Sequence, residues 1–148
     1  MDKDNNLKQV TDLLYRSSPA IRQVMSSVFS DNTGNGSTST IQIMLLSVLD
    51  EQEEISMGDL ATQLALSKSN ATMHVDKLVD RGLVERYNSK EDRRVILVRI
   101  TEQGHDFLNR CKKGTAEELR LKVSILKANE MADLTDAMNV ISKILSKK

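Results

Sequence analysis

The stretch from residue 67 to residue 101 constrains the fold of this chain more than any other. A polar helix capped by a serine is expected over residues 67–82, and an apolar strand-like run over 83–87 follows it at once. A charged turn over residues 88–94 then leads to a second strand-like run over 95–100. Since two short strands joined by a tight turn pair as a hairpin, we predict a helix followed by a hairpin with a cationic tip.

A second short helix is expected immediately before this unit. Ser56 and Asp59 fit a capping box at its start. A tight turn at Ala65 and Leu66 separates it from the helix that Ser67 caps. Two short helices joined by a turn of about three or four residues are typical of a helix-turn-helix. With the hairpin, the pattern predicts a winged helix-turn-helix over residues 40–101.

The helix that follows Ser67 has two faces when it is drawn at about 100° per residue. Ala71, Val75 and Leu78 form the face that we expect to be buried. The opposite face is polar, and a helix of this kind fits the major groove of B-DNA, where its first turns reach the base edges. Lysine can reach a phosphate or guanine, asparagine can pair with adenine, and a methyl group can contact thymine. The candidate DNA-contacting residues of this helix are Ser67, Lys68, Ser69, Asn70, Thr72, Met73 and Lys77.

The predicted hairpin tip concentrates positive charge. Residues 68–99 carry eight Lys and Arg against five Asp and Glu, within a chain whose net charge is zero. An arginine at such a tip can enter a narrow A·T-rich minor groove, where the negative potential is enhanced. Asp92 can hold the guanidinium of Arg94 in a bidentate pair and set its direction. The candidate DNA-contacting residues of the wing are Lys90, Asp92, Arg93 and Arg94.

Long amphipathic helices are expected on both sides of the winged helix. The first covers residues 7–30, where Pro19 predicts a kink or a break. Its apolar stripe either packs on its own domain or zips against a second copy, and the residues alone leave both open. Thr101 is expected to cap a helix that begins at residue 102, and Asn129 a last helix that reaches residue 146.

A loop and a central helix are expected between the first helix and the winged unit. Residues 30–39 are rich in Gly, Ser, Thr and Asn, so they predict a loop. Thr40 is expected to cap the next helix, over residues 41–52. Because that helix is apolar nearly all round, it should be central to the fold.

Composition excludes several classes of protein. At 148 residues the chain predicts one domain, with no apolar run long enough to span a bilayer and no signal peptide. Its one cysteine excludes an internal disulfide and fits a reducing cytoplasm. The two histidines lack partners at ligand spacing, so we expect no metal site and no cofactor. Without a Gly-rich phosphate loop, a nucleophile elbow or an HExxH motif, the chain is not expected to be an enzyme.

At this point the residues resemble the MarR family of winged-helix transcriptional regulators. The most specific part is Asp92-x-Arg94, followed after six residues by Thr101 and then by Gly104. The other matching pieces are residues 59–61, 66–69, 76–78 and 81–84. The resemblance implies a mainly α fold with a small β-hairpin, as a single domain over residues 1–148. Residues 40–101 would form its DNA-binding subdomain, and residues 7–30 and 102–146 its dimerisation helices.

The resemblance also implies a function. It implies a cytoplasmic homodimer that binds a palindromic double-stranded operator, usually as a repressor, and that often releases DNA when a small-molecule effector is sensed. Arg94 would be the minor-groove arginine and Asp92 its orienting partner. The competing hypothesis is a winged helix that contacts other proteins without binding DNA. Clustered arginines at the hairpin tip favour DNA.

Three residues depart from the family pattern. Met73 stands where many members carry a basic or hydroxyl residue, so no base preference is carried over. His74 stands at a usually apolar position, and we interpret it as a partly buried histidine at the edge of the helix core. The peroxide sensors of the family use a cysteine in the first helix, whereas Cys111 lies elsewhere and is expected to be a buried, inert thiol.

Overall fold

The computed structural model describes residues 3–28 and 38–145 of the chain. In chain order the elements are α1 (Lys3–Val28), α2 (Thr40–Asp50), β1 (Ile55–Ser56), α3 (Met57–Gln63), α4 (Lys68–Asp80), β2 (Val84–Asn88), β3 (Ile96–Ile100), α5 (Glu102–Val123) and α6 (Ala128–Leu145). This mainly helical fold with a small antiparallel sheet confirms the predicted fold class. Most of the predicted loop over residues 30–39 lies outside the described residues. Among the described helices, none combines the length and the apolar character needed to cross a bilayer.

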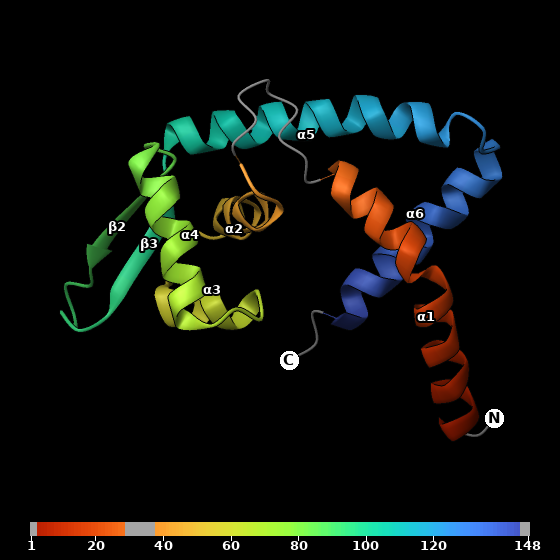
Figure 1. Ribbon diagram of the computed structural model, residues 1–148, viewed down its shortest axis with the longest axis horizontal. Helices are drawn as coiled ribbons and strands as arrows, with labels where there is room; N and C mark the ends of the chain where they lie inside the picture. The colour runs from red at the N-terminus through yellow and green to blue at the C-terminus, as the bar shows by residue number, and fades with distance from the viewer. Residues whose placement is uncertain (1–2, 29–37, 146–148) are drawn as a thin grey trace.

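The elements form two groups joined by one long helix (Figure 1). The sheet and helices α2, α3 and α4 lie at one end of α5. Helices α1 and α6 lie toward the other end, and α5 runs across the molecule between the two groups. We call residues 38–111 the winged region and α1, α6 and the second half of α5 the flanking helices.

The sheet has three strands in the order β1-β3-β2. Strands β2 and β3 form the predicted hairpin, with Val84 opposite Ile100 and Asn88 opposite Ile96. The two-residue strand β1 adds to the far edge of β3, with Ile55 opposite Val98. The turn between β2 and β3 projects away from the rest of the molecule (Figure 1).

One apolar core lies inside the winged region. Helix α2 is central to it, as predicted, because three of its leucines are fully buried. Burial of this apolar surface is the main force that holds the small region together. The largest fully buried side chains are Leu45, Leu46, Leu49, Leu60, Leu78, Leu108, Val75, Val98 and Cys111.

The predicted caps of two helices were wrong by one or two residues. Helix α2 is capped by Ser39 and not by Thr40: the Ser39 hydroxyl accepts the Gln42 amide, and the Gln42 side chain accepts the Ser39 amide at 2.9 Å. A glutamine three residues after Ser39 completes this capping box. Helix α6 begins at Ala128, ahead of the predicted cap Asn129, and the Glu130 carboxylate in its first turn accepts the Lys127 amide at 2.7 Å.

Pro19 does not break the first helix. Proline has no amide hydrogen, so the carbonyl of Tyr15 loses its usual partner. The hydroxyl of Ser18 donates to that carbonyl at 3.0 Å instead. Helix α1 continues through Pro19 with a change of direction near its middle.

Candidate nucleic-acid interface

Helix α4 is held by its two ends and by its buried face. Ser67 caps it as predicted, since its hydroxyl accepts the Asn70 amide at 3.2 Å. Ala71, Val75 and Leu78 are all fully buried, also as predicted. These contacts leave the opposite face of α4 in solvent.

Both turns around α4 have the same hydrogen-bond pattern. At the end of α3, the Ala65 amide donates to the Thr62 carbonyl and the Leu66 amide to the Ala61 carbonyl. These are the two bonds of a Schellman motif, which needs a left-handed residue. Ala65 supplies it with a φ of 51°. The end of α4 repeats the motif at Gly82, which has a left-handed φ of 69°.

The exposed face of α4 forms a shallow hollow. Five of the seven predicted helix residues line it, whereas Ser67 is used as the cap and Asn70 lies outside it. Asp76 and Asp80 line the same hollow, so the exposed face of α4 carries acids as well as the predicted bases. The lining residues are Lys68, Ser69, Thr72, Met73, Asp76, Lys77 and Asp80.

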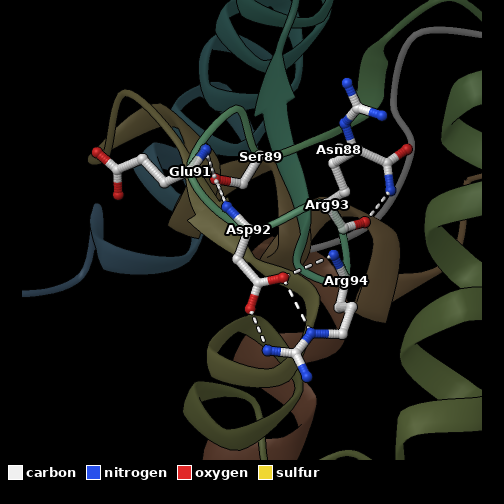
Figure 2. A network of polar contacts seen from close by, with 6 residues as sticks. All are labelled: Asn88, Ser89, Glu91, Asp92, Arg93 and Arg94. Carbon is white, nitrogen blue, oxygen red and sulfur yellow. Dashed lines mark hydrogen bonds and ion pairs between the residues drawn. The ribbon is translucent and has the colours of Figure 1, made fainter.

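The turn of the hairpin is closed by side chains as well as by the backbone (Figure 2). The Ser89 hydroxyl accepts the amides of Glu91 and Asp92 at 3.2 and 3.5 Å. The Asn88 side chain donates to the Arg93 carbonyl at 2.7 Å. This local network gives the tip a defined shape although it lies far from the core.

Asp92 holds Arg94 in the predicted bidentate pair. Oδ1 of Asp92 accepts Nε of Arg94 at 3.1 Å, and Oδ2 accepts Nη2 at 3.0 Å. Oδ1 also accepts the Arg94 amide at 3.0 Å. The Arg94 side chain is nevertheless 91% exposed, so Asp92 fixes its orientation while it remains in solvent. The Arg94 side chain and amide hold the pKa of the Asp92 carboxyl below its usual value, which keeps the pair ionised.

The two neighbouring arginines of the tip point in opposite directions. Figure 2 shows the Arg93 guanidinium on one side of the turn and the Arg94 guanidinium on the other. Arg93 and Lys90 line a hollow together with Asn88 and Ser89. Arg94 instead lines a cleft of about 370 Å³ between α4 and the hairpin. The predicted wing residues are therefore divided between two surfaces.

The cleft lies between helix α4 and the hairpin, and residues of both line it. Lys68 and Thr72 line both this cleft and the hollow on α4, so the two surfaces share a border. The cleft residues are Ser56, Met57, Gly58, Lys68, Thr72, Arg86, Arg94, Val95 and Ile96. Lys68 of α4, Arg86 of β2 and Arg94 of the hairpin turn thus line one space, and their positive charge suits it to phosphate.

Sequence reasoning missed Arg86, which lines the cleft from β2. Its Nη1 donates to Oδ1 of Asp76 on α4 at 2.8 Å. Strand alternation could have found it, because Arg86 lies two residues after the buried Val84 and so shares its face of the sheet. The same alternation places Glu85 and Tyr87 on the other face.

That other face of the sheet carries a separate polar network. The Tyr87 hydroxyl donates to Glu54, and Arg99 pairs with Glu85 across the hairpin. The hydrogen bond to Glu54 raises the pKa of the Tyr87 hydroxyl. These contacts tie the hairpin to the segment before β1, on the side away from α4.

The three residues that depart from the family pattern lie in different environments. Met73 lies on the exposed face of α4. His74 is buried, with 9% exposure, and its Nδ1 has no hydrogen-bond partner within the described residues. Cys111 is buried in the core, as expected. In residues 3–28 and 38–145, no three His, Cys, Asp or Glu side chains are grouped as a metal site would require.

Comparisons with known proteins agree with this geometry. The model of the MarR family matches residues 39–96. The chain is 28% identical to the uncharacterized HTH-type transcriptional regulator YdgJ of Bacillus subtilis over 127 residues, which are 86% of this chain and 75% of that protein. It is 42% identical to the transcriptional repressor MprA of Escherichia coli over 67 residues, which are 44% of this chain and 38% of MprA.

A solved structure covers nearly the whole fold. A mutant MarR from E. coli, crystallised in complex with operator DNA, superposes with a TM-score of 0.68 at 22% identity, over 95% of this chain and 99% of that one. The family model, the named relatives and the shared fold agree: residues 39–96 of this chain match the MarR family, and the relatives that the chain resembles are named as transcriptional regulators.

Proposed function

We propose that the protein is a transcriptional regulator that binds double-stranded DNA as a homodimer. Each subunit would place α4 in a major groove and Arg94 in the adjoining minor groove. The observation that carries this proposal is Arg94 itself. It is 91% exposed, it is directed by Asp92, and it lines one cleft with Lys68 and Thr72 of the reading helix.

A homodimer is supported by the flanking helices. None of the described side chains of α1 and α6 is buried, although both helices carry apolar stripes. A contiguous exposed apolar surface of this kind marks an interface. The exposed large apolar residues are Leu7, Val10, Leu13, Leu14, Ile21 and Val24 of α1, and Met131, Leu134, Met138, Val140, Ile141, Ile144 and Leu145 of α6.

A two-fold dimer implies a palindromic operator. Its half-sites would lie about 34–36 Å apart, one helical turn of DNA, so that both reading helices meet the same side of the duplex. We propose repression as the outcome, in line with the name of the relative MprA. Release by a small-molecule effector stays a prediction, tested by repeating the binding titration with candidate apolar acids present.

The test is a fluorescence-anisotropy titration of operator DNA selected from a random pool. Arg94→Ala should weaken binding by about 1–3 kcal/mol, because it removes the minor-groove contact. Arg93→Ala is the matched comparison, since it removes the same charge from the other side of the tip. We expect a smaller loss for Arg93→Ala, shared by all sequences.

Two results would count against the proposal. Equal DNA affinity of the wild type and Arg94→Ala would show that Arg94 of the wing does not contribute to DNA recognition. Failure of the wild-type protein to retain any duplex at low ionic strength would favour a winged helix that contacts proteins instead.

A further inference from the structure

Asp76 presents a problem for a DNA-binding surface. It lies on the exposed face of α4, in the hollow that also contains Lys68, Met73 and Lys77. Its side chain is 50% exposed. An unpaired carboxylate at this position would repel the phosphates of a docked duplex.

Arg86 meets this carboxylate from the neighbouring strand. The 2.8 Å contact between Nη1 of Arg86 and Oδ1 of Asp76 joins β2 to the middle of α4. Asp76 lines the hollow on α4, whereas Arg86 lines the adjoining cleft with Arg94. The pair therefore lies at the border between the surface that would read bases and the surface that carries the wing arginine.

We infer that Arg86 is a positioning residue for DNA recognition, which acts through Asp76. It neutralises the Asp76 carboxylate on the exposed face of α4, beside the cleft that Arg94 lines. This inference rests on the proposed function and adds a residue to it. It does not require Arg86 to touch DNA.

The pair is half-exposed, with 38% of the Arg86 side chain accessible, so it adds little to folding. Its effect should appear in DNA binding, where phosphates approach the uncovered carboxylate. Arg86→Gln should reduce affinity for the selected operator by about tenfold, because it exposes Asp76 to like charge. Arg86→Lys keeps the charge beside Asp76 and should lose much less.

The decisive variant is Asp76→Asn combined with Arg86→Gln. In this double variant no carboxylate is left unpaired by the loss of Arg86, so affinity should return to within about threefold of the wild type. The matched control is Asp80→Asn combined with Arg86→Gln. Asp80 lines the same hollow and has the same charge, but its carboxylate makes no ion pair with Arg86. A rescue that depends on the pair should occur with Asp76→Asn and not with Asp80→Asn.

The dependence of affinity on salt separates positioning from direct contact. A lost phosphate contact lowers the slope of log K against log salt by about one. Positioning predicts a slope close to that of the wild type in Arg86→Gln. A slope lowered by one, with no rescue by Asp76→Asn, would identify Arg86 as a phosphate ligand and overturn the inference.

The remaining outcomes are also distinct. Equal rescue by Asp80→Asn would mean that only the net charge of the surface matters for affinity. Wild-type affinity of Arg86→Gln would mean that Arg86 has no role in DNA binding. Both overturn the inference and leave the proposed function intact. A wild-type protein that retains no duplex would defeat the proposed function itself. Urea unfolding of each variant checks that the winged region remains folded.

Discussion

The winged region and the flanking helices use similar apolar residues in opposite ways. In the winged region, leucines and valines from α2, α3, α4, β3 and the first half of α5 bury one another almost completely. In α6, apolar residues at helical spacing remain between 37% and 79% exposed. The first region therefore has its own core, whereas the apolar side chains of α6 are not covered by any other part of residues 3–28 and 38–145.

This difference indicates that the winged region determines folding stability and that the flanking helices determine association. A mutation in the winged region should act on folding at any protein concentration. A mutation on the flanking helices should act through association, because a dimer is stabilised by mass action. The expected outcomes below test that division, in order of decreasing effect.

Gly104→Ala should have the largest effect. A Cβ at this position would lie 2.1 Å from the Leu83 carbonyl oxygen and 2.6 Å from Cγ1 of Ile100. Since backbone cannot yield cheaply, we expect a loss of about 3 kcal/mol or more in the free energy of unfolding, measured in urea. Gly58→Ala is the control, because its nearest atom is Ser56 Oγ at 3.8 Å, and it should be neutral or slightly stabilising. Similar losses in both variants would contradict the steric account.

Leu78→Ala and Ile141→Ala compare the two regions directly. Leu78 is fully buried and its truncation should cost about 2–5 kcal/mol at every protein concentration. Ile141 is 49% exposed in one subunit, so its truncation should shift the dimerisation constant instead. Unfolding at several concentrations, with sedimentation velocity, separates the two. A concentration-independent loss for Ile141→Ala would argue against the proposed dimer.

Asp50 tests the contact between α2 and α5. Hydrogen bonds from Lys112 and, to a lesser degree, His105 hold its carboxyl pKa below the ordinary value of 3.8. A lowered folded pKa stabilises the protein above pH 3.8, and this contribution is lost as pH falls below 3.8 through the folded value.

Asp50→Asn should therefore lose up to about 1 kcal/mol at pH 7 and should show a flatter acid limb than the wild type. The measurement is urea unfolding between pH 7 and pH 3. Asp106→Asn, on the exposed side of α5, is the comparison variant. If it flattened the acid limb equally, the effect of Asp50→Asn would not come from the Lys112 contact.

Ala65→Gly should have the smallest effect, and it should be favourable. Ala65 holds a left-handed conformation with a φ of 51°, which costs an L-residue about 1–2 kcal/mol. Part of that gain is offset by the greater freedom of glycine in the unfolded chain, so we expect stabilisation by about 0.5–1 kcal/mol. Ala116→Gly, inside exposed helix α5, should instead destabilise by about 1 kcal/mol. A loss in both variants would mean that the turn is not strained.

Much of the winged region was predictable because its determinants are local. Ser67 caps the helix that it precedes, and Gly82 ends it, through bonds that span only a few residues. The pairing of Asp92 with Arg94 is equally local, since the two side chains are separated by one residue on a tight turn. Local rules also explain why Ser39 caps α2 in place of Thr40, because Gln42 lies three residues after Ser39 and completes a capping box.

The sequence by itself determined the helices, the hairpin, the cap of α4 at Ser67 and the cationic tip, because short-range backbone geometry sets each of them. Only the tertiary structure decided that Arg93 and Arg94 face different surfaces, that Arg86 meets Asp76, and that Gly104 permits α5 to approach the Leu83 backbone. Such contacts join elements distant in the sequence. Their geometry depends on how the whole core packs, which no local pattern of residues specifies.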